Sequence, residues 1–426
     1  MELAAEALSL LERLVRAQTD GENAVQAVIV KALKGAGCQV ETRTYTPSNV
    51  PVIAEFAFIG PEADTPRTAV IGRLAGTDPT RNSLLLFAHP DAEQTHTGPD
   101  WERALFEITE ARGCLHGWGV ADDLAGCAAA VIAVQRLART NEARGDLVFA
   151  STPSKRHARG VAALLHEGLA ADAALYLHPA ESGRGMREIK AVSPGLLEFT
   201  VTVTGRHPET SEPSHTAFSH LAVNPFDKAV RIHRGLMDLA DRRAARVRHP
   251  LIEEAVGRAT NLQISAVGCG NMESLSRLGG ECVLGCSASF SPGETLKEVS
   301  NEIETAISEI CEKDEWLREH PPRVDWVSGV SAAEVTQTDP LWVTASRAVH
   351  AVTGSQPILN PMHTASDIRV PLVEKGIPCV GLGCLAGDLT HSGGHDEWVD
   401  RDDYVRMVEV TARVASDWCA SARSDA

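Results

Sequence analysis

The sequence lacks the features that mark membrane-spanning and secreted proteins. None of its apolar runs is long enough to cross a bilayer, and no apolar core follows a basic segment near the N-terminus. The ten cysteines include no C-x-x-C pair. We therefore expect a cytoplasmic protein without a signal peptide, in which the cysteines are reduced and buried.

Positive charge is also scarce, because the formal net charge at pH 7 is −17. Nucleic acids and anionic membranes both bind basic surfaces, so this balance argues against either one as a partner. We expect no nucleic-acid and no membrane partner.

The order of predicted elements indicates an α/β fold. Predicted strands at 83–90, 146–152 and 171–179 alternate with predicted helices at 124–140 and 160–168. This alternation is typical of a sheet whose strands are at least partly parallel and lie between helices.

The pattern changes over 193–324, where alternating strands and amphipathic helices predict a compact α+β unit. Afterwards the α/β pattern resumes. We therefore expect a discontinuous catalytic domain, 1–192 and 325–426, with a mixed, largely parallel sheet, and an inserted α+β satellite domain, 193–324. A chain of 426 residues is long enough for two domains.

Histidine and aspartate side chains gather at the ends of these elements. His89 and Asp91 end the first of the three strands, His178 ends the third, and Asp122 and Asp123 directly precede the first helix. Taken alone, a histidine is more often structural, and paired aspartates before a helix are often N-caps. Because open α/β sheets bind ligands at the carboxyl ends of their strands, the combination favours a metal site.

Several short motifs occur in an order that resembles a known family. They are "AHPD", "GWGVADD", "SFSPGET", "TASDIR" and "HSGGHDEWV". In this order they resemble the co-catalytic zinc peptidases and deacylases, which include glutamate carboxypeptidase, acetylornithine deacetylase and aminoacylase. The resemblance covers nearly the whole chain, including the satellite domain. It implies a dimerisation or lid role for that domain, and hence a homo-oligomer of at least two chains.

The resemblance implies a set of metal ligands, namely His89, Asp122, His178 and His391, with His395 as a less favoured substitute for His391. Asp122 would bridge two metals, and Asp91 would orient His89. His215 and Arg369 would bind the substrate, and a guanidinium is suited to gripping a carboxylate.

One motif departs from the family. Where the family has a Glu-Glu pair after "T-P", this chain reads "TPSKRHARG", with Lys155, Arg156 and His157 in place of carboxylates. The first Glu would be the general base and the second a ligand of the second metal. A cation about 5 Å from a divalent ion repels it by several kcal/mol in a partly dry site. We therefore expect one weakly held Mn, Zn, Co or Fe ion per chain, although His157 in one register could replace the lost ligand.

Without its general base the site would be poor at cleaving an unactivated amide, because such a base contributes about 10²–10⁴-fold. We expect a hydrolase that cleaves a C–N bond in a small carboxylate-bearing substrate by metal-bound hydroxide, with Asp91, Lys155, Arg156 and His157 as catalytic candidates. In this departure the chain resembles an unusual branch of the family that hydrolyses an aromatic amine activated by a nitro group. The resemblance implies conversion of 5-nitroanthranilate to 5-nitrosalicylate plus ammonia.

Two alternatives remain open. One is an N-acyl amino acid deacylase or dipeptidase with a relocated base. The other is a catalytically inactive binding or regulatory homologue, although the retention of so many predicted ligands argues against it.

Overall fold

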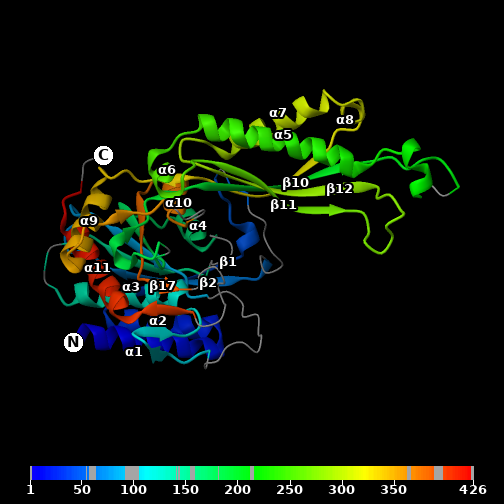
Figure 1. Cartoon of the computed structure of the whole chain (residues 1–426). Helices are drawn as coiled ribbons and strands as arrows, with labels where there is room; N and C mark the ends of the chain where they lie inside the picture. Colours follow the sequence, from blue (N-terminus) through cyan, green and yellow to red (C-terminus); the bar gives the residue numbers. More distant parts are fainter. Residues whose placement is uncertain are drawn as a thin grey trace. The chain divides into compact units, whose positions relative to one another are not determined.

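The computed structural model describes residues 2–53, 55–56, 64–91, 105–140, 142, 144–153, 159–180, 182–211, 215–361, 366–387 and 397–423. The chain divides into two compact units (Figure 1). The larger comprises Met1–Ile53, Ile59–Val192 and Ala333–Ala426, and the smaller comprises Ala54–Phe58 and Ser193–Ala332. Among the described residues, no helix has both the length and the apolar character to cross a membrane.

A six-stranded sheet organises the larger unit. Its strands, in spatial order, are β1 (Gln39–Tyr45), β2 (Arg67–Leu74), β6 (Leu147–Ser151), β3 (Leu84–Ala88), β7 (Ala173–Leu177) and β16 (Cys379–Leu382). The last four run parallel to one another, whereas β1 and β2 pair in antiparallel fashion. The four parallel strands are buried along their whole length, as expected for strands covered on both faces.

Helices cover both faces of this sheet, and alternate residues of each strand point to opposite layers. On β3, Leu84 and Leu86 pack in one core while Leu85 and Phe87 pack in the other. The first core contains α1 (Glu2–Ala17), α2 (Glu22–Gly35), α3 (Ala125–Ala138), α9 (Pro340–Thr353) and α11 (Arg401–Ala420). The second contains α4 (Arg159–His166) and α10 (Arg369–Lys375). This arrangement confirms the predicted α/β class with a mixed, largely parallel sheet.

Short strands complete the larger unit. An antiparallel sheet joins β17 (Ala386–Gly387), β18 (Trp398–Asp400), β5 (Cys114–His116) and β4 (Thr109–Ala111). Among the described residues there are four further two-residue strands, β8 (Glu188–Ile189), β9 (Val192–Ser193), β14 (Ala333–Glu334) and β15 (Ile358–Leu359).

The smaller unit is an antiparallel sheet with helices on one side (Figure 1). Its strands, in spatial order, are β11 (Asn261–Cys269), β12 (Glu281–Phe290), β10 (Gly195–Thr204) and β13 (Arg323–Val330). The helices are α5 (Pro225–Arg246), α6 (Pro250–Val256), α7 (Leu296–Cys311) and α8 (Glu315–Glu319). Alternate residues of β10, such as Phe199 and Val201, face the apolar stripes of α5 and α7.

Candidate metal centre

The candidate site lies at the carboxyl edge of the parallel strands. His89 directly follows β3, Thr152 directly follows β6, and His178 directly follows β7. These three strands are neighbours in the sheet, so their ends meet at one edge. This is the edge at which open α/β sheets bind their ligands.

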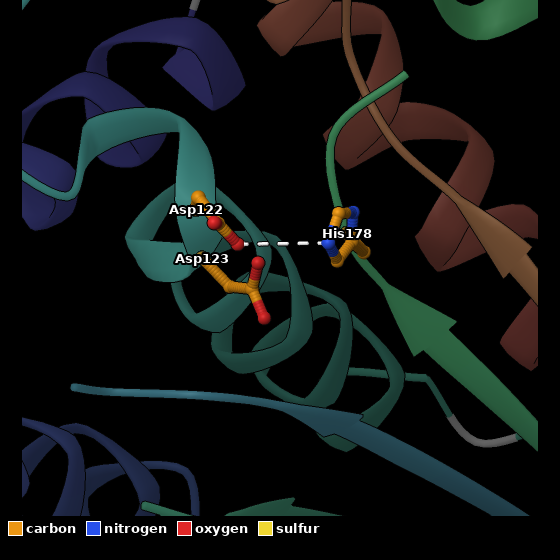
Figure 2. Close-up of side chains that lie close together, drawn as sticks. All are labelled: Asp122, Asp123 and His178. Carbon is orange, nitrogen blue, oxygen red and sulfur yellow. Dashed lines mark ion pairs between the residues drawn. The ribbon is translucent and has the colours of Figure 1, made fainter. Parts of the chain in front are cut away.

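Asp122 and Asp123 face this edge from the loop before α3. Their backbone is non-helical, and the peptide bond between them is cis. Neither residue caps α3, whose N-cap is Leu124, so the helix-cap interpretation of this pair is wrong. Asp122 Oδ1 lies 3.6 Å from His178 Nε2 (Figure 2). One possible ligand atom from each of Asp122, Asp123 and His178 lies within 4.8 Å of the others.

A glycine allows this close approach. A Cβ atom added at Gly126, in the first turn of α3, would lie 2.2 Å from the carbonyl oxygen of Leu177. Only a residue without a side chain therefore lets the start of α3 pack against the end of β7. That contact carries the aspartate pair to His178.

The carboxylate of Glu397, which is 4 % exposed, holds the loop before α3. This carboxylate accepts hydrogen bonds from the backbone N–H groups of Gly119 at 2.9 Å, Ala121 at 2.8 Å and Asp122 at 3.1 Å. Hydrogen bonds to an ionised acceptor are stronger than neutral ones. Glu397 therefore positions Asp122 through the main chain.

Tyr176 lies between the two histidines. Its ring stacks on Phe87 with centroids 4.8 Å apart, and its centroid lies 5.4 Å from that of His89 and 5.0 Å from that of His178. The hydroxyl donates to Asp123 Oδ2 at 3.2 Å. Burial, together with the nearby carboxylates, raises the pKa of Tyr176 well above its usual value, so the phenol stays protonated and remains a donor.

The ring of His89 is held by oxygen atoms of Thr152 and Asp367. Its Nδ1 lies 2.7 Å from the carbonyl oxygen of Thr152, and its Nε2 lies 3.2 Å from Asp367 Oδ2. Burial would lower the pKa of His89, but the hydrogen bond to Asp367 and the surrounding carboxylates outweigh it and raise that pKa to about 9. Burial would likewise raise the pKa of Asp367, but the bonds from His89 and Arg369 lower it to about 2. In the metal-free protein the two form an ion pair.

Two buried cationic side chains lie beside these groups. Arg369 Nη1 is 3.0 Å from Asp367 Oδ1, and Arg369 is only 4 % exposed. Lys190 Nζ is 3.1 Å from His178 Nδ1 and 2.7 Å from the carbonyl oxygen of Pro179. Both cations offset the charge of the buried carboxylates.

The other predicted residues are distributed as follows. Asp91 is partly exposed two residues beyond His89. His215 belongs to the smaller unit, where its Nδ1 accepts a hydrogen bond from the N–H of Ala217 at 3.1 Å. In the neutral ring Nε2 must then carry the hydrogen and serve as a donor. Five predicted residues lie outside the described part of the chain: Lys155, Arg156, His157, His391 and His395.

Sequence reasoning missed several residues of the site. The sequence pairs Asp123 with Asp122 without distinguishing a ligand from a helix cap, and it assigns no role to Tyr176, Lys190, Asp367 or Glu397. Two signals were present: Asp367 lies inside "TASDIR", and Glu397 follows Asp396 inside "HSGGHDEWV".

The donor set is compatible with a divalent transition metal. Two carboxylates and one imidazole suit Mn, Fe, Co or Zn, which bind such oxygen and nitrogen atoms at about 2.0–2.2 Å. Ligands of one ion at that distance lie at most about 4.4 Å apart. The possible ligand atoms of Asp122, Asp123 and His178 lie within 4.8 Å of one another, so side-chain shifts of a few tenths of an ångström bring them within this limit.

Comparisons with known proteins agree with this fold. The sequence model of peptidase family M20/M25/M40 matches residues 85–417. An N-formyl-4-amino-5-aminomethyl-2-methylpyrimidine deformylase of Bacillus subtilis is 26% identical over 82% of this chain and 83% of its own. A succinyl-diaminopimelate desuccinylase of Roseobacter denitrificans is 28% identical over 78% of this chain and 82% of its own.

Solved structures show the same architecture. The aminopeptidase PepT of Bacillus cereus superposes with a TM-score of 0.71 at 16% identity, over 97% of this chain and 98% of that one. The YXEP protein of Bacillus subtilis, described as a dinuclear metal-binding peptidase, gives 0.62 at 15% identity, over 98% and 99%. At these identities the likeness concerns the fold.

Replacing Gly126 with alanine should disrupt the site. The added Cβ must push α3 away from Leu177, which we expect to cost about 1–3 kcal/mol of unfolding free energy. Gly35→Ala is the matched control, because nothing lies within 4 Å of a Cβ there and the change should be neutral or slightly stabilising. Urea unfolding measures both, and equal effects of the two substitutions would contradict the close-approach explanation.

Replacing Glu397 with glutamine should loosen the loop that carries Asp122. Glutamine keeps the shape but loses the charge and turns an NH₂ group toward backbone donors, for an expected cost of about 2–3 kcal/mol. Glu12→Gln, at a half-exposed surface pair, should stay within about 0.5 kcal/mol of wild type. If thermal unfolding does not distinguish the two variants, Glu397 does not hold the loop.

Proposed function

Because the chain belongs to peptidase family M20/M25/M40 and is a metal-dependent hydrolase of C–N bonds, we propose that it hydrolyses such a bond in a small carboxylate-bearing substrate. The observation that carries this proposal is the cluster of Asp122, Asp123 and His178 at the carboxyl edge of the sheet. Tyr176 and His89 border the same cluster.

We propose that this cluster holds one divalent transition metal. A bound ion would supply Lewis acidity, lowering the pKa of water and stabilising negative charge at the reacting centre. The preference for one ion rests on the sequence, which has Lys155 and Arg156 where the resembled family has its Glu pair. A weakly held Mn, Zn, Co or Fe ion is the form that we expect.

The chain's own residues would prepare the site. The carbonyl oxygen of Thr152 accepts a hydrogen bond from His89 Nδ1. This bond orients the ring so that Nε2 points toward Asp367. The Tyr176 hydroxyl fixes the orientation of Asp123. We place His89 beside the cluster as a further ligand, and we retain Asp91, His157, Lys155 and Arg156 as candidates for proton transfer and charge stabilisation. His391, or His395, would be a ligand only of a second ion.

Two residues are proposed to bind the substrate carboxylate. Arg369 is buried near His89 and shares its charge with Asp367, so an anionic group would compete for the guanidinium. His215 would donate from Nε2, since Nδ1 is engaged with Ala217. The association of chains through the satellite domain, as a homo-oligomer in the cytoplasm, belongs to the same proposal.

For the reaction itself we propose hydrolysis of an activated aromatic amine. In 5-nitroanthranilate the nitro group stands para to the amine and accepts charge from the attacked ring carbon. Water adds its oxygen to that carbon, the C–N bond breaks, and 5-nitrosalicylate and ammonia form. The absence of a carboxylate between Ser151 and Gly160 favours this substrate, since less is required of a protein base.

A second candidate is removal of a small acyl group from an amine. Two of the relatives described above favour it, because one is named a deformylase and the other a desuccinylase. This reaction would require a base elsewhere in the site.

The metal-loaded protein should release ammonia from 5-nitroanthranilate but not from anthranilate, which lacks the activating nitro group. Ammonia assay together with loss of the substrate's absorbance measures this. Turnover of N-formyl or N-succinyl amines, with no ammonia from 5-nitroanthranilate, would reject the first candidate and support the second.

Substitutions Asp123→Asn and His178→Ala should each weaken metal binding by at least about 100-fold, because each removes a donor from the cluster. Asp241→Asn is the matched control, since that side chain is 85% exposed and belongs to the smaller unit. Titration calorimetry of metal-free protein with Mn²⁺ or Zn²⁺ gives the affinities. Unchanged affinity in both site variants would place the metal elsewhere.

A further inference from the structure

Two cysteines of the smaller unit stand directly opposite each other. Cys269 ends β11 and is paired in register with Cys282 near the start of β12. Cys269 is exposed and Cys282 is buried. Cα atoms of such antiparallel pairs lie about 4.5 or 5.5 Å apart, and disulfides form across about 4.4–6.8 Å. The backbone therefore already holds this pair at a bonding distance.

The two thiols also differ in their surroundings. Burial, together with the hydrogen bond to Cys269, raises the pKa of the Cys282 thiol to about 12. Cys282 is thus the protonated, protected member, while Cys269 is the one that solvent can reach.

Glycines surround the pair and leave the backbone free to adjust. Gly268 and Gly270 flank Cys269, and Gly279 and Gly280 lie just before β12. Gly270 has a φ of 67°, and a Cβ atom at Gly279 would lie 3.1 Å from the Gly270 Cα. The two strands therefore approach closely at this point, which we call the neck and which comprises residues 268–270 and 279–282.

The loop that this neck closes holds the segment of His215. The N–H of Thr216 donates to the carbonyl oxygen of Ser276 at 2.8 Å, and its hydroxyl donates to the same atom at 3.0 Å. His215 itself forms an isolated antiparallel bridge with Arg277. The position of His215 thus depends on how firmly residues 270–280 are held.

We propose that Cys269 and Cys282 form a reversible disulfide that closes this neck and restrains the segment of His215. With hydrogen peroxide as oxidant, the Cys269 thiolate takes one oxygen to become a sulfenic acid and releases one water. Cys282 sulfur then attacks Cys269 sulfur and displaces the second water, so two thiols and one peroxide give one disulfide and two waters. A dithiol reverses the step. The functional meaning, control of the proposed substrate-binding His215, rests on the proposed function.

The bond itself is tested by peptide mapping without reduction. Full-length protein is treated with hydrogen peroxide, alkylated and digested. We expect a Cys269–Cys282 cross-link that is absent from Cys269→Ser and Cys282→Ser and persists in Cys286→Ser, a control at a buried cysteine of the same strand. A Cys269–Cys269 link between two chains, or sulfinic acid at Cys269 with Cys282 still alkylated, would overturn the proposal.

The restraint is tested by hydrogen exchange on the same samples. Oxidation should slow exchange in peptides covering 215–221 and 270–280 by about tenfold in wild type, and dithiothreitol should restore it. In Cys269→Ser, an exposed position where folding is not at risk, peroxide should leave exchange unchanged. A cross-link without slower exchange at 215–221 would refute the link to His215. Neither measurement depends on turnover, so a failure of the proposed reaction would be recognised separately.

Discussion

Burial of several carboxylates at one edge of the sheet is the constraint on which the site depends. Asp122, Asp123 and Asp367 lie within the protein, where the described cations Arg369 and Lys190 offset part of their charge, and an ionised carboxylate loses much favourable hydration when it leaves water. The raised pKa of His89 is a direct response, since protonation of the ring compensates one of these charges. A divalent cation bound by Asp122, Asp123 and His178 would compensate two more of these negative charges. This demand for positive charge, more than any single ligand distance, is the reason why we propose a metal site at this edge.

The scaffold sets this constraint through contacts made far from the carboxylates in sequence. Gly126 lets α3 reach the end of β7, and Glu397, almost 280 residues from Gly119, fixes the loop through main-chain donors. Both act on the backbone, so neither of these two contacts uses the carboxylates of the aspartates. Their side chains are left for chemistry.

Much of the architecture could be predicted from the sequence, because buried parallel strands are uninterrupted apolar runs. β3, β6 and β7 illustrate this, and the ends of β3 and β7 located His89 and His178. β1 and β13 were missed, since both are edge strands with exposed polar residues and carry no such run. The direction of the Asp123 side chain could not be predicted because it follows from a non-helical backbone, and the role of Asp367 could not because Asp367 meets His89 across 278 residues.

The chemistry that we propose depends on what replaces the missing glutamates, and therefore on how many ions the site holds. Anomalous diffraction from crystals soaked in Mn²⁺ or Zn²⁺ at the metal's absorption edge addresses this directly. The account predicts a single strong peak per chain, bounded by Asp122, Asp123 and His178. Two peaks of comparable height, or one peak away from these three residues, would contradict it.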